Sequence, residues 1–141
     1  MKKKFGLIGK SLKHSISPQI HHHWYDANKI DANYELIEIS ENEIQSVIER
    51  IKKKDLMGIN VTIPYKQTVI PFLDQIINEA KETHSVNTIY LNDQGKVIGE
   101  NTDVYGIEYS FIKKVETIDQ KEALILGAGG VAPSIIYALN K

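Results

Sequence analysis

The strongest constraint on the fold is a strand, a helix and a second strand that follow one another between residues 34 and 61. Residues 34–39 (YELIEI) and 57–61 (MGINV) have the length and composition of strands. Between them, Ser40 and Glu43 have the spacing of a helix capping box. Four apolar side chains then recur at the i, i+3, i+4, i+7 positions of a buried helix face: Ile44, Val47, Ile48 and Ile51. Because strands joined through a crossover helix are parallel, this segment predicts an α/β fold.

The other segments extend this pattern. Residues 5–8 predict a short strand, and Ser17-Pro18 predicts a helix with Ser17 as N-cap and Pro18 at the first helical position. Residues 88–91 and 97–99 predict a hairpin around the turn at 92–95. Further helices are expected within 64–75, over about 76–83, and from Asp103 to about Lys114, the last with inward side chains at Ile107, Phe111 and Ile112. We therefore expect an α/β fold: a mostly parallel open sheet with helices on both faces and one antiparallel hairpin.

A glycine-rich turn lies near the end of the sequence. The apolar run 122–126 predicts a strand, residues 127–132 (GAGGVA) fit the pattern G-x-G-x-x-G/A, and a helix is expected from Val131. In this context the glycines allow backbone to approach a dinucleotide pyrophosphate, and the free N–H groups of the helix start attract phosphate. The alternative is a glycine-rich turn that binds nothing. The residue that distinguishes NAD from NADP, expected ~20 positions further on, would lie beyond Lys141.

These elements predict two domains. Residues 1–115 are expected to form a substrate-binding domain, the polar segment 116–120 is a boundary, and residues 121–141 are the first βα unit of a Rossmann domain. A single strand–turn–helix unit cannot close a sheet of its own. We therefore expect a larger protein that has been shortened. An unpaired apolar strand also favours association, which makes a homodimer through residues 121–141 possible.

Composition narrows the classes of partner. The net charge is −1, so no broad positive field attracts nucleic acid or an anionic membrane, and local groups must bind any anionic ligand. Without cysteine the chain forms no disulfide and no cysteine-ligated zinc site. No apolar run approaches the ~20 residues of a membrane span, and the N-terminus lacks the apolar region of a signal peptide. We expect a cytoplasmic protein with a small-molecule substrate.

Two groups of polar residues are candidates for a site. Ser15 and Ser17 lie in a loop that enters a helix, where both hydroxyls can donate to a carboxylate, although Ser17 alone is equally explained as an N-cap. Asn60, Thr62 and Lys66 follow a strand toward the carboxyl end of the sheet, where ligands of open α/β sheets bind. The three consecutive histidines at 21–23 cannot converge on one metal ion, because successive helical residues point about 100° apart; a packing or solvated role is expected, and no metal site.

Lys66 is informative only with a partner, since a lone lysine is usually solvated. Asp103, at the junction between a strand and a helix, is a candidate partner, but it is also a plausible helix N-cap. Asn87, in the segment SVNT, adds an amide at the start of a strand.

Five motifs in order (GLIG…HSISP, GINVTIPYK, SVNT, GENTDVYG and GAGG) resemble the shikimate dehydrogenase family from Phe5 to the end of the chain. The resemblance implies an NADP-dependent oxidoreductase of aromatic amino-acid and chorismate biosynthesis, which reduces 3-dehydroshikimate reversibly to shikimate with NADPH. By this match Ser15 and Ser17 hold the substrate carboxylate, Thr62, Asn87 and Asp103 bind the ring hydroxyls, and Lys66 and Asp103 form the catalytic pair. Cofactor contacts are implied at Gly127, Ala128, Gly129, Gly130 and Val131.

The sequence departs from the family pattern at His84-Ser85, where the family usually has Gly-Ala, and this places a bulkier, titratable side chain beside the substrate loop. The family's later residues for adenosine phosphate, nicotinamide and the rest of the substrate pocket are missing, so we expect weak shikimate binding at best and no measurable dehydrogenase activity. A quinate/shikimate dehydrogenase that uses NAD is the near alternative. A methylenetetrahydrofolate dehydrogenase is a distant one, against which HSISP and NTD speak. A non-catalytic hydroxy-acid-binding module is the alternative outside the enzymes.

Overall fold

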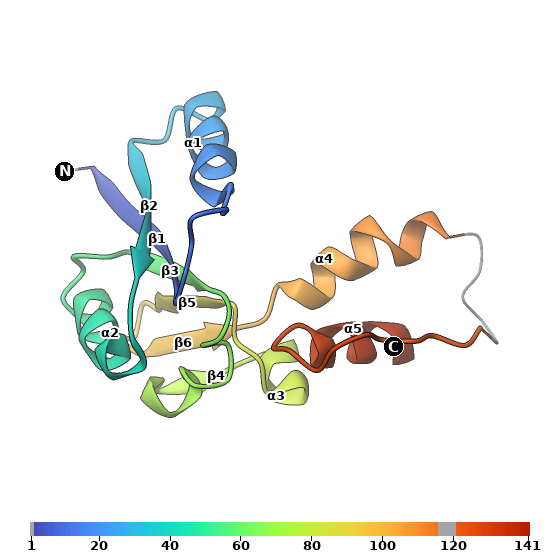
Figure 1. Ribbon diagram of the computed structural model, residues 1–141. Coiled ribbons are helices and arrows are strands. Elements are labelled where there is room, and N and C mark those ends of the chain that lie inside the picture. Colours follow the sequence, from blue (N-terminus) through green and yellow to red (C-terminus); the bar gives the residue numbers. More distant parts are fainter. Residues whose placement is uncertain (1, 116–120) are drawn as a thin grey trace.

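Six strands form a single sheet in the computed structural model, which describes residues 2–115 and 121–141 (Figure 1). The order across the sheet is β2-β1-β3-β5-β6-β4. The strands are β1 (Lys3–Gly9), β2 (Ala32–Glu38), β3 (Gly58–Val61), β4 (Gln75–Ile76), β5 (Thr88–Leu91) and β6 (Val97–Glu100). The predicted boundary at 116–120 lies outside the described residues.

Five of the six strands run in one direction. β1 pairs in parallel with β2 and β3, and β4 pairs in parallel with β6. β5 is antiparallel to both of its neighbours, β3 and β6. The β5–β6 hairpin turns at Gly95, whose φ of +75° is a conformation that glycine adopts without strain. The prediction of a mostly parallel sheet with one hairpin is confirmed.

Helices cover both faces of the sheet. Successive side chains of a strand point to opposite faces, and accordingly Leu7 and Ile8 of β1 belong to two separate apolar clusters. Leu7 packs with Tyr25 of α1 (Ser17–Ala27), whereas Ile8 packs with α2 (Ile44–Lys52). Figure 1 shows α1 and α2 on different sides of β1 and β2. This arrangement confirms the prediction of helices on both faces.

The amphipathic helix α2 forms as the sequence predicts. Ser40 and Glu43 make the reciprocal contacts of a capping box, and the first turn, Glu41–Glu43, is a 3-10 turn that leads into α2. All four periodic side chains are buried, with Ile44 and Ile51 fully inaccessible. They supply one side of the larger cluster, which also contains Ile59 and Ile89 from the centre of the sheet.

The start of α1 differs from the prediction. Ile16, and not Ser17, is the N-cap, because its carbonyl accepts the first helical hydrogen bond, from the N–H of Ile20 (3.2 Å). Ser17 is therefore the first helical residue, and its N–H donates to Ser15 Oγ (3.3 Å). Pro18 lies in the first turn, as expected. The helix starts one position earlier than predicted, because the hydroxyl of Ser15 accepts the N–H of Ser17, the residue that the sequence pattern predicted as N-cap.

The segments after β3 agree with the prediction in part. The short helix expected within 64–75 is the 3-10 turn Ile70–Phe72, but the helix expected over 76–83 is shorter: β4 takes Gln75–Ile76 into the sheet, and α3 begins at Glu79 and ends at Thr83. Helix α4 (Asp103–Ser110) begins where predicted, and a 3-10 turn, Ile112–Lys114, follows it. The prediction for Phe111 was wrong, because that side chain is 54% exposed and Val104 is the fully buried residue of α4.

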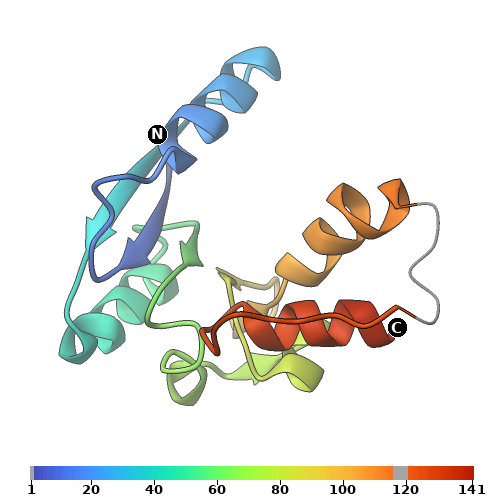
Figure 2. The same cartoon turned by 45° about the vertical axis from the view of Figure 1, so that its right-hand side comes forward.

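The glycine-rich turn leads into α5 (Ala132–Asn140), which confirms the predicted helix. The strand predicted at 122–126 is wrong for the described chain: this stretch pairs with none of the six strands, and Leu124 and Leu126 are 86% and 89% exposed. A strand requires a neighbouring backbone to satisfy its ladder, and the described residues offer none at this place. Figure 2 shows α5 running alongside α4, away from the sheet.

Candidate active site

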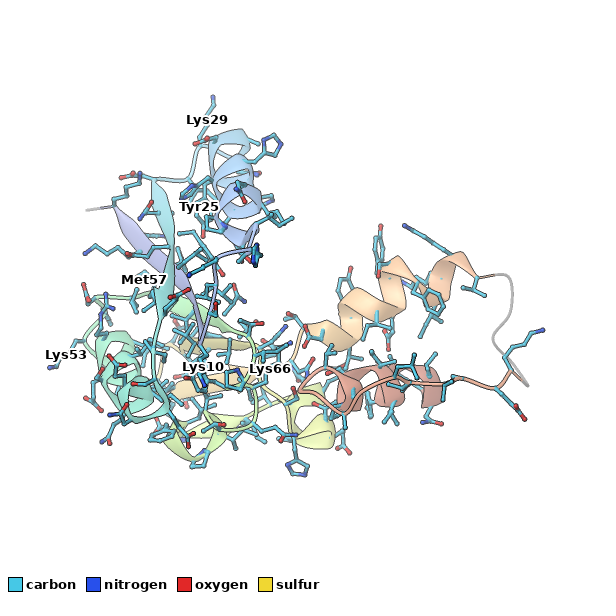
Figure 3. The ribbon with its side chains drawn as sticks, in the orientation of Figure 1. Lys10, Tyr25, Lys29, Lys53, Met57 and Lys66 are labelled. Atoms are coloured by element: carbon cyan, nitrogen blue, oxygen red, sulfur yellow. The ribbon has the colours of Figure 1, made fainter. Side chains whose placement is uncertain are left out.

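A polar cavity of about 510 Å³ lies where the sheet meets the loop before α1 and the start of α4. Figure 3 shows Lys66 at the junction of the sheet with the α4–α5 pair. The cavity is lined by all six residues that the sequence suggested for substrate binding: Ser15, Ser17, Thr62, Lys66, Asn87 and Asp103. The structure therefore brings together side chains that are separated by up to 88 positions (15 to 103) in the sequence.

Lys66 and Asp103 form an ion pair in this cavity. Lys66 Nζ lies 2.6 Å from Asp103 Oδ2, and the two side chains are only 11% and 20% exposed. Lys66 follows β3 and the loop that contains the cis Ile63–Pro64 peptide, whereas Asp103 is the first residue of α4. At this degree of burial a charged group requires a counter-charge, so each residue explains the position of the other.

Asn87 connects this ion pair to the centre of the sheet. Its Nδ2 donates to the second carboxylate oxygen, Asp103 Oδ1 (2.8 Å), and its Oδ1 accepts from the backbone N–H of Thr102 (2.9 Å). The backbone carbonyl of Asn87 accepts from the N–H of Val61 in β3 (2.8 Å). Both oxygens of Asp103 therefore have donors, and the carboxylate is held in one orientation.

The two serines of the first loop form a pair of hydroxyls. Ser15 Oγ donates to Ser17 Oγ over 3.1 Å, and both side chains are half-buried at the cavity wall. Thr62 follows β3 directly and is anchored by its N–H, which donates to Ile8 O (3.0 Å). Hydroxyl groups donate and accept, so this side of the cavity can bind a carboxylate together with neutral hydroxyl groups.

The cavity wall also includes His21 and Tyr34, which the sequence did not suggest for the site, and Asn60, which it did. The rings of His21 and Tyr34 are stacked, with centroids 3.9 Å apart and planes at 6°. Tyr34 Oη donates to Asn60 Oδ1 (2.7 Å), and Asn60 Nδ2 donates to Thr88 Oγ1 (3.2 Å). The stacking of His21 on Tyr34 of β2 joins residues from two elements, so the sequence spacing alone could not reveal it.

Burial shifts the pKa values of two side chains in this wall, Tyr34 and His21. Desolvation raises the pKa of Tyr34, with a smaller contribution from Tyr25, and keeps its hydroxyl protonated as a donor. Desolvation also lowers the pKa of His21, and the neighbouring His22 adds to this effect. The packing role expected for the histidine run holds for His21. Among the residues that the structure describes, no group of three His, Asp or Glu side chains is arranged to hold a metal ion.

The glycine-rich loop does not line the cavity but lies against Lys66. A Cβ atom built at Gly130 would be 3.2 Å from Lys66 Cβ. Gly127 has φ +112°, and a Cβ there or at Gly129 would meet nothing within 4 Å. The loop thus leaves room for a phosphate to approach its backbone at the start of α5, and its residues fit a dinucleotide pyrophosphate.

His84 and Ser85, where the sequence departs from the family pattern, have opposite environments. His84 ends α3 in the left-handed conformation (φ +46°), is exposed, and is not among the residues that line the polar cavity. The expected crowding of the substrate loop by His84 is therefore wrong, because its side chain points to solvent. Ser85 is fully buried, and its Oγ donates to Gly130 O (2.6 Å).

None of the helices in the described ranges has the length and apolarity needed to cross a membrane.

Comparison with known proteins identifies relatives of the chain. The family described as "Shikimate dehydrogenase substrate binding domain" matches residues 7–89, more than half of the 141 residues. The shikimate dehydrogenase (NADP(+)) of Pelagibacter ubique is 48% identical over 141 residues, which are 100% of this chain and 53% of that protein. The crystal structure of shikimate dehydrogenase 1 from Peptoclostridium difficile superimposes with a TM-score of 0.91 at 37% identity, covering 98% of this chain and 51% of that one.

A second similar structure, from Thermus thermophilus, is a shikimate 5-dehydrogenase in complex with NADP(H) and shikimate; it has a TM-score of 0.87 and 26% identity, and the match covers 98% of this chain and 52% of that one. The chain thus spans about half the length of the relatives it matches. Both superpositions cover 98% of this chain. The chain therefore belongs to the shikimate dehydrogenase family.

Proposed function

We propose that the chain carries the substrate site of an NADP-dependent shikimate dehydrogenase, which reduces 3-dehydroshikimate reversibly to shikimate. The observation that carries the proposal is the ion pair of Lys66 and Asp103 in a polar cavity that also contains Ser15 and Ser17. A pure binding module does not require a largely buried lysine–aspartate pair, whereas ketone reduction does require a proton donor at the oxygen. The relatives named above support the same activity.

The chemistry assigns a role to each member of the pair. Reduction of a ketone by hydride leaves an oxygen that takes up a proton, and oxidation of the alcohol removes one. The ammonium of Lys66 can donate that proton and stabilise the negative charge that develops on the oxygen. Asp103 holds Lys66 in place and accepts a hydrogen bond from the substrate hydroxyl. In the direction of oxidation the same lysine, as the neutral amine, takes the proton back.

Substrate recognition is assigned to the remaining polar groups. Ser15 and Ser17 would donate to the substrate carboxylate from the loop before α1. Thr62, Asn87 and Asp103 would bind ring hydroxyls, because each presents a donor or acceptor to the cavity. Charged or hydrogen-bonded contacts of this kind discriminate strongly against analogues that lack the matching group.

NADP is the proposed cofactor, and it supplies the hydride when it is bound. In this chain the residues that would hold its pyrophosphate are Gly127, Ala128, Gly129, Gly130 and Val131, whose backbone is open to solvent at 127 and 129. The contact of Gly130 with Lys66 would bring this cofactor-binding loop next to the reacting pair. The preference for NADP over NAD rests on the names of the relatives. NAD remains the alternative cofactor, because a similar structure from Listeria monocytogenes (TM-score 0.85) is described as a complex with shikimate and NAD.

We further propose that residues 1–115 form the substrate-binding domain and that residues 121–141 belong to a nucleotide-binding domain. Two observations support this division. All members of the two apolar clusters, including their partly buried neighbours, lie at or before Val97, and Leu124 and Leu126 are exposed and belong to neither cluster. A cytoplasmic location follows from the proposed biosynthetic role and is proposed with it.

One similar structure points to a second candidate substrate. The 5-ketofructose reductase of a Gluconobacter strain superimposes with a TM-score of 0.85 at 27% identity. A sugar ketone has no carboxylate, so the paired hydroxyls of Ser15 and Ser17 favour a hydroxy acid over it. Quinate, which has both a carboxylate and ring hydroxyls, is the closer alternative.

Calorimetric titration of the chain tests the proposal. Shikimate is expected to bind weakly, and Ser15→Ala should weaken the affinity about tenfold, the usual cost of one hydrogen bond to a charged group. Ser46→Ala is the matched control, because Ser46 is exposed on α2 and donates only to Glu43 O. Equal affinity for shikimate and for a carboxylate-free ketose, or the absence of any shikimate binding, would refute the proposed substrate.

A further inference from the structure

Three polar side chains are buried together between α3, the end of β6 and α5. Ser85 and Ser134 have no exposed surface, and Asn101 is 2% exposed. Burying such groups is costly unless they form hydrogen bonds. Here each has a partner: Ser85 Oγ donates to Gly130 O (2.6 Å), and Asn101 Nδ2 donates to Ser85 O (2.8 Å) and to Ser134 Oγ (2.9 Å). We refer to Ser85, Asn101 and Ser134 as the buried polar cluster.

The buried polar cluster joins the glycine-rich loop to the segment that carries the ion pair. Val86, which follows Ser85, donates its N–H to Lys66 O (2.8 Å). Asn101 Oδ1 accepts the N–H of Asp103 (2.9 Å). On the other side, Gly130 packs against the aliphatic part of Lys66, where an added Cβ would be 3.2 Å from Lys66 Cβ. The segment Ser85–Val86 therefore contacts both the backbone of Lys66, through Val86, and the loop beside it, through Ser85.

Substitution with alanine isolates the contribution of the Ser85 hydroxyl. An alanine at 85 would fill nearly the same space but would leave Gly130 O without this donor. Helix α4 packs directly on α5, and Ser85 belongs to neither helix, so we expect this packing to persist in that case. The hydrogen bond from Ser85 acts on the loop itself, and so its effect can be separated from the docking of the helix.

We infer that Ser85 is a positioning residue that fixes the glycine-rich loop, through its bond to Gly130 O, in register with Lys66 and Asp103. The inference rests on the proposed function of the loop as a pyrophosphate site. Asn101 and Ser134 extend the same connection into α5. Hydride transfer depends on the distance between cofactor and substrate. The hydroxyl of Ser85 would therefore set the position of the glycine-rich loop relative to Lys66 and Asp103, without contacting either ligand.

Nuclear magnetic resonance on the chain tests this inference in the Ser85→Ala variant. The carbonyl carbon of Gly130 should shift upfield, because it loses a hydrogen-bond donor. Amides of the first turns of α5, including Ile135, should exchange about three- to tenfold faster, as expected for the loss of one neutral hydrogen bond. Amides of α2 should exchange at the wild-type rate. Ser46→Ala, the exposed control, should change none of these observables.

A second variant separates loop from helix. Ser134→Ala removes the bond that Ser134 accepts from Asn101, so it should accelerate exchange in α5 and leave the Gly130 carbonyl resonance in place. An unchanged Gly130 resonance in Ser85→Ala would overturn the inference, and so would equal acceleration in α2 and α5, which would mean a general loss of stability. Ser85→Ala should bind shikimate like the wild type. A wild-type chain that binds no shikimate would refute the proposed substrate but not the Ser85–Gly130 contact.

Discussion

Lys66 Nζ and Asp103 Oδ2 lie 2.6 Å apart although 37 positions separate them in the sequence. The distance depends on two parts of the fold: the loop after β3 delivers the lysine, and the start of α4 delivers the aspartate. Asn87 holds the other carboxylate oxygen from the start of β5. Three segments must therefore be packed correctly before the pair can form.

Asp103→Ala should destabilise the chain, because it leaves the largely buried ammonium group of Lys66 without its counter-charge. We expect a loss of about 1–3 kcal/mol in the free energy of unfolding, below the 3–5 kcal/mol typical of a fully buried pair, since both side chains retain some exposure. Urea unfolding at neutral pH measures the loss. The double variant Lys66→Met/Asp103→Ala should recover part of it, and a double variant less stable than Asp103→Ala alone would contradict the argument.

Two glycines should respond oppositely to alanine. Gly99→Ala in β6 should cost about 1–3 kcal/mol, because the new Cβ would overlap Leu73 and lie 3.0 Å from Val86 Cγ2 in a packed interior. Gly106→Ala in α4 should stabilise by up to about 1 kcal/mol, because nothing lies within 4 Å and alanine favours the helix. Thermal unfolding monitored by circular dichroism gives both signs. Equal effects at the two positions would show that space around the backbone is not the cause.

Acid should destabilise the chain through His21. Burial lowers the pKa of His21 in the folded state below its ordinary value of 6.5. As the pH falls below 6.5, the unfolded chain therefore binds more protons than the folded chain. Stability then rises with pH through this range and is lost as pH falls from about 7 toward 5. The urea midpoint should therefore drop less between pH 7.5 and 5.5 in His21→Gln than in the wild type.

The matched control for this pH effect is His23→Gln, because His23 is exposed on the same helix. That variant should keep the full wild-type difference between the two pH values. A His21→Gln chain with the same pH dependence as the wild type would show that His21 is not the source of the acid sensitivity.

The exposed leucines near the glycine-rich loop should promote self-association. Leu124 and Leu126 border a hollow of about 690 Å³ that is lined largely by apolar side chains such as Phe111 and Leu139. Exposed apolar surface of this kind favours contact with another molecule. Sedimentation velocity should show a dimer that grows with concentration, and Leu126→Lys should shift the equilibrium to the monomer. A monomer at all concentrations would contradict this expectation of self-association.

The sequence alone predicted the parts of this protein that depend on local pattern. The spacing of Ile44, Val47, Ile48 and Ile51 and the capping box before them determine α2, because helix period and end signals are properties of neighbouring residues. The turn with Gly95 determines the hairpin in the same way. The order of five motifs was enough to indicate the family and the residues of the candidate site.

The tertiary structure decided what depends on distant neighbours. Whether Lys66 meets Asp103, whether His21 stacks on Tyr34, and whether Ser85 reaches Gly130 are questions of distance across the fold, for which spacing gives no measure. Residues 122–126 illustrate the same limit: their composition favours a strand, but a strand exists only where another backbone accepts its hydrogen bonds. Local chemistry selects the elements, and packing determines which of their side chains share a cavity.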